Sequence, residues 1–120
     1  MGRVIYNDDE DPTTLERVLQ LHGQFRRGLE PIGVTPLQAG VLLYVSRHTE
    51  TNMTNTAAAL CLRPPTLTVV MKDLVRKRWV VKGRSVMDTR VVHLQLSRRG
   101  QALTQKIEQR VRHVNATLAE

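Results

Sequence analysis

The stretch of sequence that decides the fold covers residues 54–97 and reads TNTAAALCLRPPTLTVVMKDLVRKRWVVKGRSVMDTRVVHLQLS. It opens with Thr54 ahead of Ala57-Ala58-Ala59-Leu60. This pattern predicts a short helix that is capped by Thr54 and whose small residues let another helix approach closely. A tight turn over residues 61–63 is expected next. Pro64-Pro65 then predicts the start of a second helix, because neither proline has a backbone donor and both have a helix-compatible φ.

The second helix of this stretch is expected to run to about Arg78 and to bury one face. Its apolar residues recur at helical spacing on one side, at Leu67, Val70, Met71 and Leu74. The opposite side is therefore expected to face outward. It carries Pro65, Val69, Lys72 and Arg76, flanked by Thr66, Thr68 and Asp73.

From Trp79 onward the hydrophobic period changes to two. Trp79-Val80-Val81 and residues 91–96 are β-branched or alternating, so they predict two strands joined by a polar loop over residues 82–90. Two short helices joined by a tight turn, followed by a two-stranded basic hairpin, have the order of a winged helix-turn-helix. In that arrangement the second helix enters the major groove of DNA and the hairpin reaches an adjacent groove.

The N-terminal side of this stretch predicts two further helices. Residues 13–30 carry apolar side chains at helical spacing, whereas residues 1–12 lack that pattern and are expected to form a tail or strap. Thr35-Pro36-Leu37-Gln38 combines an N-cap, a proline at the first helical position and a capping-box glutamine, and predicts a helix to about Arg47. Residues 48–53 are expected to form a loop.

The C-terminal side predicts one long helix over residues 97–120, capped by Ser97, whose apolar seam usually needs a partner helix. We therefore expect residues 13–30 and 97–120 to be dimerisation helices beside a DNA-binding lobe of residues 35–96. Together they would form a single domain of residues 13–120, mainly α with a small β wing. The expected homodimer interface comprises Leu15, Val18, Leu19, Phe25, Leu103, Ile107, Val111, Val114 and Leu118.

Composition and charge agree with a helical nucleic-acid-binding domain. Hydrophobic residues make up 41% of the chain and aromatic residues only 3%, a mixture that suits packed helices better than a β-sandwich. Residues 1–60 hold 5 Lys/Arg against 7 Asp/Glu (net −2), whereas residues 61–120 hold 13 against 4 (net +9), so the positive charge of the chain, +7 in all, comes from the second half. Such a concentrated positive surface is typical of polyanion-binding proteins, because each neutralised phosphate releases condensed counterions.

The sequence offers little support for an enzyme, a metal site or a membrane protein. Four histidines are scattered over different predicted elements: His22, His48, His93 and His113. They form no metal-ligand spacing and lie near no phosphate-cradling loop, so we expect no catalysis, cofactor or metal. Cys61 is the only cysteine, which excludes an internal disulfide. The acidic residues 8–11 contradict a signal or transit peptide, and with no long apolar run a cytoplasmic location is expected.

Several motifs resemble those of the MarR family of bacterial regulators, and the match runs without gaps from about Val34 to Gly100. Asp88-Thr89-Arg90, followed by Leu96-Ser97-Arg98-Arg99-Gly100, resembles the wing signature of that family, Asp-x-Arg and then Leu-Ser/Thr-x-x-Gly. The resemblance implies a transcriptional regulator, and a repressor in particular, that binds a palindromic double-stranded DNA operator as a homodimer. It also implies that Arg90 enters the minor groove and that Asp88 orients its guanidinium group.

The chain departs from the family pattern at three positions of the DNA-binding lobe. Arg63 stands where the family usually has a serine cap, and Arg78 stands where it often has glycine before the first wing strand. Val69 replaces a common arginine, which favours contact with a thymine methyl group. The expected DNA-binding residues are Arg63, Pro65, Thr66, Thr68, Val69, Lys72, Arg76, Lys82, Arg84, Asp88 and Arg90.

The sequence leaves open two other functions and one added role. The same domain would serve an architectural or partner-binding protein that has no sequence preference and no effector. Cys61 is a candidate peroxide switch, although its place between Leu60 and Leu62 favours a small buried side chain. The resemblance implies a small anionic or aromatic effector held between the dimerisation helices and the DNA-binding lobe. The candidate effector-binding residues are His22, Arg26 and Tyr44, although the place of His22 on an apolar face favours a core histidine.

Overall fold

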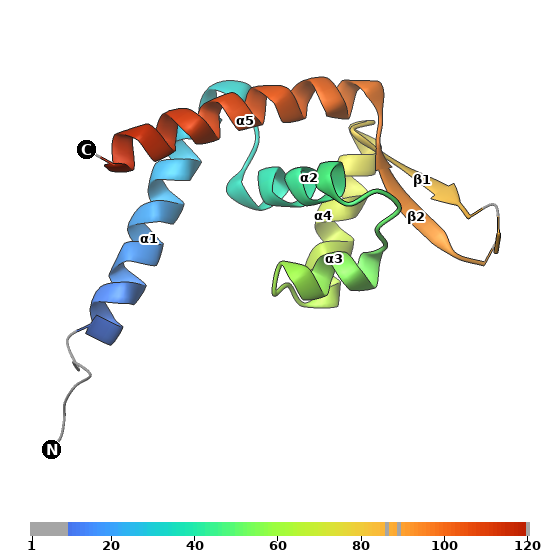
Figure 1. The fold of residues 1–120 in the computed structure, drawn as a ribbon, viewed down its shortest axis with the longest axis horizontal. Coiled ribbons are helices and arrows are strands. Elements are labelled where there is room, and N and C mark those ends of the chain that lie inside the picture. The colour runs from blue at the N-terminus through green and yellow to red at the C-terminus, as the bar shows by residue number, and fades with distance from the viewer. Residues whose placement is uncertain (1–9, 86, 89, 120) are drawn as a thin grey trace, which may run out of the picture.

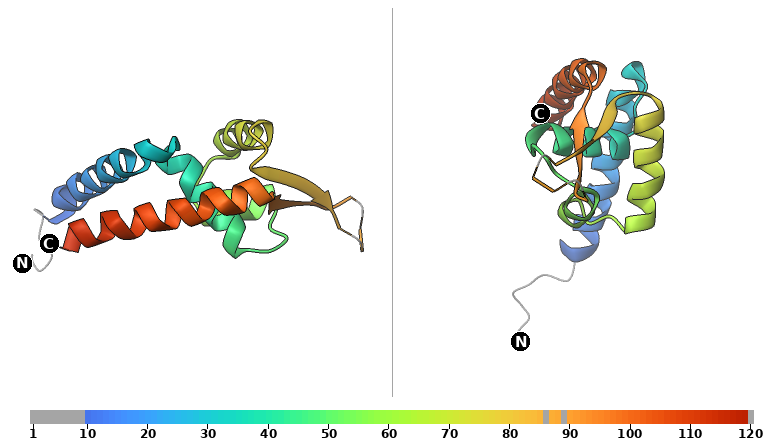
Figure 2. Two further views of the ribbon diagram at one scale, coloured as in Figure 1. Left: turned by 90° about the horizontal axis from the view of Figure 1, so that it is seen from above. Right: turned by 90° about the vertical axis from the view of Figure 1, so that its right-hand side faces the viewer.

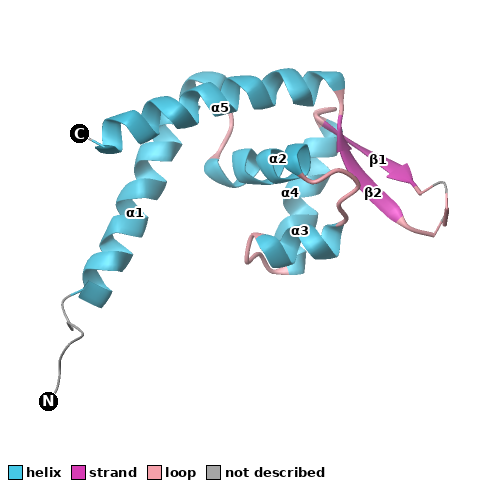
Figure 3. Ribbon diagram, viewed as in Figure 1, coloured by secondary structure: helices cyan, strands magenta, loops and turns pink. Residues whose placement is uncertain are grey.

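The computed structural model describes residues 10–85, 87–88 and 90–119. Its elements follow one another as α1 (Glu10–Leu29), a short 3-10 helix (Glu30–Ile32), α2 (Pro36–Arg47), α3 (Met53–Ala59), α4 (Pro64–Arg76), β1 (Val80–Arg84), β2 (Val92–Leu96) and α5 (Arg98–Ala119) (Figure 1). The described strands form one antiparallel hairpin in an otherwise helical chain (Figure 3). The structure therefore has the mainly α winged helix-turn-helix fold that the sequence predicts.

The described part of the molecule is elongated, with principal extents of 58 × 35 × 21 Å. Helices α2, α3 and α4 and the hairpin lie together at one end, while α5 runs from the hairpin back to α1 (Figure 1). Seen from above, α1 and the hairpin lie toward opposite ends of α5 (Figure 2). Helix α1 meets α5 at its C-terminal end and runs away from α5 toward its own start (Figure 1). None of the helices in the described residues combines the length and the apolar character that a bilayer crossing requires.

Two helix starts differ from the sequence-based expectation. Helix α1 begins at Glu10 rather than at Thr13 or Thr14, and residues 1–9 of the expected tail lie outside the described residues. Pro12 falls in the first turn, where a backbone N–H has no acceptor within the helix. Helix α3 is capped by Asn52 and not by Thr54, because the Asn52 side chain accepts from the backbone N–H of Asn55 at 2.8 Å.

The start of α2 confirms the predicted capping box. The hydroxyl of Thr35 accepts from the backbone N–H of Gln38 at 3.1 Å, and the Gln38 side-chain oxygen accepts from the backbone N–H of Thr35 at 3.0 Å. Pro36 occupies the first helical position. Two otherwise unpaired backbone donors are thereby satisfied.

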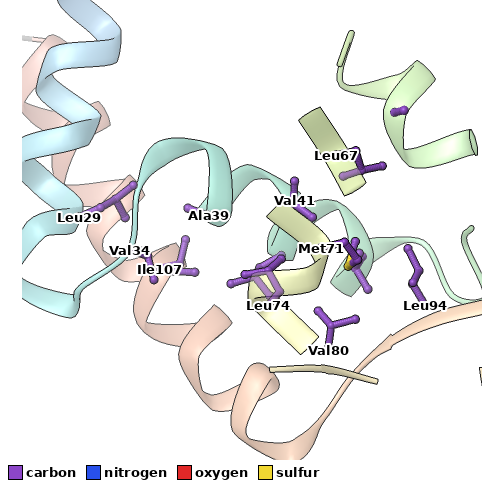
Figure 4. Packing of buried hydrophobic residues seen from close by; sticks show 13 residues of the cluster. Leu29, Val34, Ala39, Val41, Leu67, Met71, Leu74, Val80, Leu94 and Ile107 are labelled. Carbon is purple, nitrogen blue, oxygen red and sulfur yellow. The ribbon is translucent and has the colours of Figure 1, made fainter. Parts of the chain in front are cut away.

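The hydrophobic core is formed where α4 packs on α2 and on the hairpin. Leu67, Met71 and Leu74 are the fully buried side chains of α4, as the helical spacing predicts. Figure 4 shows them beside Val41 of α2 and Leu94 of β2. The core therefore fixes the rotation of α4 about its axis, and with it the residues that α4 presents to solvent.

The hairpin is anchored at its base and extends away from the core. Its register pairs Val80 with Leu96 at the base and Arg84 with Val92 at the outer end. The backbone N–H of Leu94 also donates to the carbonyl of Thr51 at 2.8 Å, which ties β2 to the loop between α2 and α3. Strand β2 of the wing is therefore held by β1 and also by the loop between α2 and α3.

Cys61 and Arg78 adopt left-handed backbone conformations, with φ of 53° and 64°. Arg78 occupies the position where the resemblance to MarR-type regulators expects glycine, and its φ explains that preference. The expectation that Cys61 is buried is wrong. Its left-handed turn directs the side chain into solvent, while its neighbours Leu60 and Leu62 pack against the core.

The flanking helices pack on each other within one chain, which corrects part of the predicted dimer interface. Helix α1 approaches α5 so closely at Gly28 that a Cβ there would lie 2.4 Å from the Val114 side chain. Ile107 and Val114 are buried in the single chain, with 0% and 5% exposure. Phe25, Leu103 and Val111 are partly buried against the core. Four of the nine predicted interface residues stay exposed: Leu15, Val18, Leu19 and Leu118.

The junction between β2 and α5 explains the Leu-Ser-x-x-Gly motif in structural terms. The Ser97 hydroxyl accepts from the backbone N–H of Gly100 at 3.0 Å and donates to the carbonyl of Arg78 at 2.5 Å. Gly100 lies so close to the preceding turn that an added Cβ would be 2.1 Å from the carbonyl oxygen of Trp79. The motif therefore joins the start of α5 to the entry of the hairpin.

Replacing Gly100 with alanine should destabilise the fold, because the new Cβ would collide with backbone that cannot move independently. We expect Gly100→Ala to lower the free energy of unfolding by about 1–3 kcal/mol in urea denaturation. Gly40→Ala in α2 is the matched control, since a Cβ at Gly40 meets nothing within 4 Å. That control should be neutral or stabilising by up to about 1 kcal/mol. Equal stability of both variants would contradict the proposed close contact.

Candidate nucleic-acid interface

Helix α4 presents a continuous exposed face on the side opposite the core. Its residues expected to bind DNA are all exposed in the structure, namely Pro65, Thr66, Thr68, Val69, Lys72 and Arg76, with Arg63 at the N-cap. Val69 is a large hydrophobic residue of the helix that is nevertheless 69% exposed. The Thr68 hydroxyl donates to the carbonyl of Pro64 at 2.9 Å, so its methyl group and lone pairs are left for other contacts. The Arg63 side chain makes no capping hydrogen bond.

The carboxylate of Asp73 organises the cations at the C-terminal half of this face. It accepts from the Gln38 amide at 2.9 Å and from the Arg76 guanidinium, and it lies 3.7 Å from the Lys77 ammonium. The i,i+3 and i,i+4 spacing of Asp73 to Arg76 and Lys77 is visible in the sequence. The contact with Gln38 is not, since 35 residues separate the two.

The tip of the hairpin carries the second group of predicted DNA-binding residues. The Arg90 guanidinium donates to both carboxylate oxygens of Asp88, each at 3.1 Å, and the Arg90 backbone N–H donates to Asp88 Oδ1 at 3.0 Å. The Arg90 side chain is 89% exposed. The ion pair with Asp88 therefore fixes the direction in which the charged guanidinium group of Arg90 points into solvent.

The charge state of this pair is stable toward acid. Hydrogen bonds from the Arg90 side chain, and then from its backbone N–H, lower the pKa of the Asp88 carboxyl below its ordinary value. A lowered pKa keeps the carboxylate ionised as the pH falls to and below the usual range of an aspartate. The pair therefore remains charged at neutral and mildly acidic pH.

The turn that carries Arg90 is held by side-chain and backbone hydrogen bonds. The Ser85 hydroxyl accepts from the backbone N–H groups of Met87 and Asp88, at 3.2 and 3.4 Å. The backbone N–H of Ser85 donates to the carbonyl of Val91, and that of Val91 donates to the carbonyl of Asp88, each at 3.0 Å. Lys82 and Arg84 are exposed on β1 below this tip.

The three residues predicted to bind an effector, His22, Arg26 and Tyr44, do not line the cavity that the structure shows between α1 and α5. His22 is exposed and is therefore not the core histidine that its position favoured. The Tyr44 ring stacks on the His48 ring, with centroids 4.0 Å apart. A cavity of about 300 Å³ lies instead between α1 and α5, lined by Gln24, Arg27, Gly28, Arg110, His113, Val114 and Thr117.

No metal site is visible among the described residues, which contain no group of three or more His, Cys, Asp or Glu side chains able to hold an ion. His93 contacts Glu50 instead, with its Nδ1 3.1 Å from the carboxylate. The exposed face of α4 and the tip of the hairpin are the surfaces at which the residues predicted to bind DNA gather.

Solved structures of MarR-type regulators share this fold. The transcriptional repressor CouR bound to a 23-mer DNA duplex is 24% identical, with a TM-score of 0.83 over 99% of this chain and 87% of that one. CouR from Rhodococcus jostii RHA1 bound to p-coumaroyl-CoA is 22% identical, with a TM-score of 0.83 over 92% and 78%. A mutant MarR from E. coli complexed with operator DNA is 21% identical, with a TM-score of 0.80 over 96% and 84%.

A family model identifies the chain more directly than these distant structures. A comparison with curated protein sequences gives no match. The model described as transcriptional regulator SarA/Rot matches residues 25–107, which span the end of α1, the whole DNA-binding lobe and the first half of α5. This is more than half of the chain. The chain belongs to the SarA/Rot family of transcriptional regulators.

Proposed function

We propose that this regulator binds a specific palindromic site in double-stranded DNA as a homodimer and acts as a cytoplasmic repressor. The observation that carries the proposal is the pairing of two exposed basic surfaces, the outer face of α4 and the tip of the hairpin with its Asp88–Arg90 fork. A recognition helix and a wing of this kind fit adjacent grooves of one duplex.

In the proposed complex the N-terminal half of α4 contacts bases and its C-terminal half contacts phosphates. Thr66, Thr68 and Val69 lie where a recognition helix reaches the base edges, and Val69 suits a thymine methyl group. Lys72 and Arg76 lie further along, where the phosphate backbone runs. Arg90 enters the minor groove, where a narrow groove has an enhanced negative potential.

The proposed homodimer pairs through the outer face of α1 and the end of α5. Leu15, Val18 and Leu19 remain exposed at 61%, 52% and 64%, although they lie on one long amphipathic helix. Such a stripe is costly in water, and a second copy related by a two-fold axis would cover it. The same axis would bring two recognition helices to successive major grooves.

The proposal extends to release from DNA by a small anionic effector. The cavity between α1 and α5 combines Arg27, Arg110 and His113, which are side chains that bind anions. The side-chain oxygen of Gln24 is buried in the same region without a hydrogen-bond partner in the described structure, and a ligand hydroxyl would satisfy it. The Arg110 guanidinium already bridges the two helices by donating to the carbonyl of Gly28 at 2.7 Å.

Selection of binding sites from a random duplex library tests the proposed function. The full chain should enrich an inverted repeat whose half-sites lie about 34–36 Å, or roughly 10 base pairs, apart. Sedimentation of the free protein should give a dimer, and Leu19→Glu should give a monomer that binds the selected repeat weakly. Gln20→Glu is the matched control, since it adds the same charge to α1 beside the stripe. Absence of any enriched sequence would support an architectural protein instead.

The wing arginine should contribute to affinity without contributing to stability. We expect Arg90→Ala to weaken binding to the selected repeat by roughly ten- to a hundredfold at moderate salt, since a minor-groove contact is lost. The melting temperature should not change, because the side chain is almost fully exposed. Arg112→Ala on α5 removes the same charge away from the wing and should leave affinity nearly unchanged. If both variants bind alike, Arg90 has no special role.

The two halves of α4 should respond differently to substitution. Lys72→Ala should weaken binding to all duplexes alike and reduce the slope of log affinity against log salt by about one, as expected for one phosphate contact. Val69→Ser should change the preferred base instead and leave that slope unchanged. Binding measured at several salt concentrations to the selected repeat and to single-base variants of it separates these effects. A changed base preference in Lys72→Ala would contradict the assignment.

A further inference from the structure

We propose that Asp73 is a specificity-determining residue that restrains Arg76 from binding the phosphates of nonspecific DNA. The inference rests on the proposed function, because it assigns a role to an acidic side chain within the proposed DNA-binding face. Asp73 is the acidic residue of α4, and it lies among the cations of that face.

The carboxylate of Asp73 is held in place from a second helix. Its Oδ2 accepts from Gln38 Nε2 at 2.9 Å, and the Gln38 oxygen accepts from the backbone N–H of Thr35 at 3.0 Å. Reversing the Gln38 amide would set its NH₂ against the Thr35 N–H and its oxygen against the carboxylate. The capping box of α2 therefore fixes the position of the carboxylate on α4.

The fixed carboxylate in turn holds Arg76. The Arg76 guanidinium donates to Asp73 Oδ1, and its side chain is 77% exposed while that of Asp73 is 23% exposed. Lys77 lies 3.7 Å from the other carboxylate oxygen. Lys72, by contrast, has no acidic partner within the described part of the chain. Lys72 is thus unrestrained on this face, whereas Arg76 and Lys77 share the carboxylate of Asp73.

This arrangement affects nonspecific binding more than specific binding. Phosphate contacts supply nearly all of the affinity for nonspecific DNA, whereas a specific site adds base contacts. A carboxylate beside the phosphate backbone repels it and competes with it for Arg76. In a specific complex the base contacts fix the position of α4, so a released Arg76 would gain less there than in a nonspecific complex, where the helix adjusts freely to the phosphates. Asp73 therefore lowers nonspecific affinity more than specific affinity and raises the ratio of the two.

The substitution Asp73→Asn tests the proposal, because asparagine keeps an oxygen that accepts from Gln38 and removes the charge that holds Arg76. In the full chain it should raise affinity for a random-sequence duplex by roughly three- to tenfold at low salt and steepen the salt slope by about one. The ratio of affinities for the selected repeat and the random duplex should fall. Asp73→Glu keeps the charge and should retain the behaviour of the unmodified chain.

Two further variants separate this role from a general effect of charge or stability. Glu30→Gln makes the same change in net charge in the 3-10 helix, outside the proposed interface, and should leave the salt slope unchanged. In the background of Arg76→Ala, the gain from Asp73→Asn should be clearly smaller, since only the weaker contact with Lys77 and the direct repulsion of phosphate by the carboxylate remain. A thermal melt of each variant reports its folding.

The proposal is overturned if Asp73→Asn binds random duplex no more tightly than the unmodified chain. It is also overturned if the same gain persists without Arg76. These results differ from a failure of the proposed function, in which the unmodified chain itself binds the selected repeat no better than random duplex.

Discussion

The burial of one face of α4 is the constraint on which the rest of the structure depends. Leu67, Met71 and Leu74 are almost fully buried against α2 and the hairpin, so α4 has a single rotation that satisfies the core. Each fully buried leucine contributes roughly 1.5–3 kcal/mol relative to exposure, whereas a surface ion pair contributes under about 1 kcal/mol. The apolar face therefore decides which residues α4 presents, and the charges only refine how it presents them.

Two carboxylates then organise the cations that this rotation exposes. Asp88 fixes the guanidinium of Arg90 at the tip of the hairpin, and Asp73 fixes that of Arg76 at the C-terminal end of α4. Both lie in a segment rich in Lys and Arg, where acidic side chains weaken attraction to phosphate. A carboxylate at such a position does not add to the positive charge of the surface. Its role is to orient and restrain the arginine guanidinium that it binds.

The flanking helices serve the fold of the single chain as well as the proposed dimer. Ile107 and Val114 of α5 pack inside the chain, where α1 crosses at Gly28. The leucines and valine nearer the start of α1 lie beyond that crossing and remain exposed. The apolar residues of the two flanking helices thus fall into a group that joins α1 to α5 within one chain and a group that the proposed dimer would cover.

The resemblance to the MarR family implied the fork of Asp88 and Arg90, whereas the sequence by itself determined the order of the elements, the capping box at Thr35 and the buried face of α4. These follow from short-range spacing, caps and period, which act within a few residues of the chain. Only the tertiary structure decided the exposure of Cys61, the inward place of Ile107 and the bond between Gln38 and Asp73. Each of these depends on which segments meet in space. An amphipathic stripe or a polar side chain could contact several different segments, and the tertiary packing decides which of them it contacts.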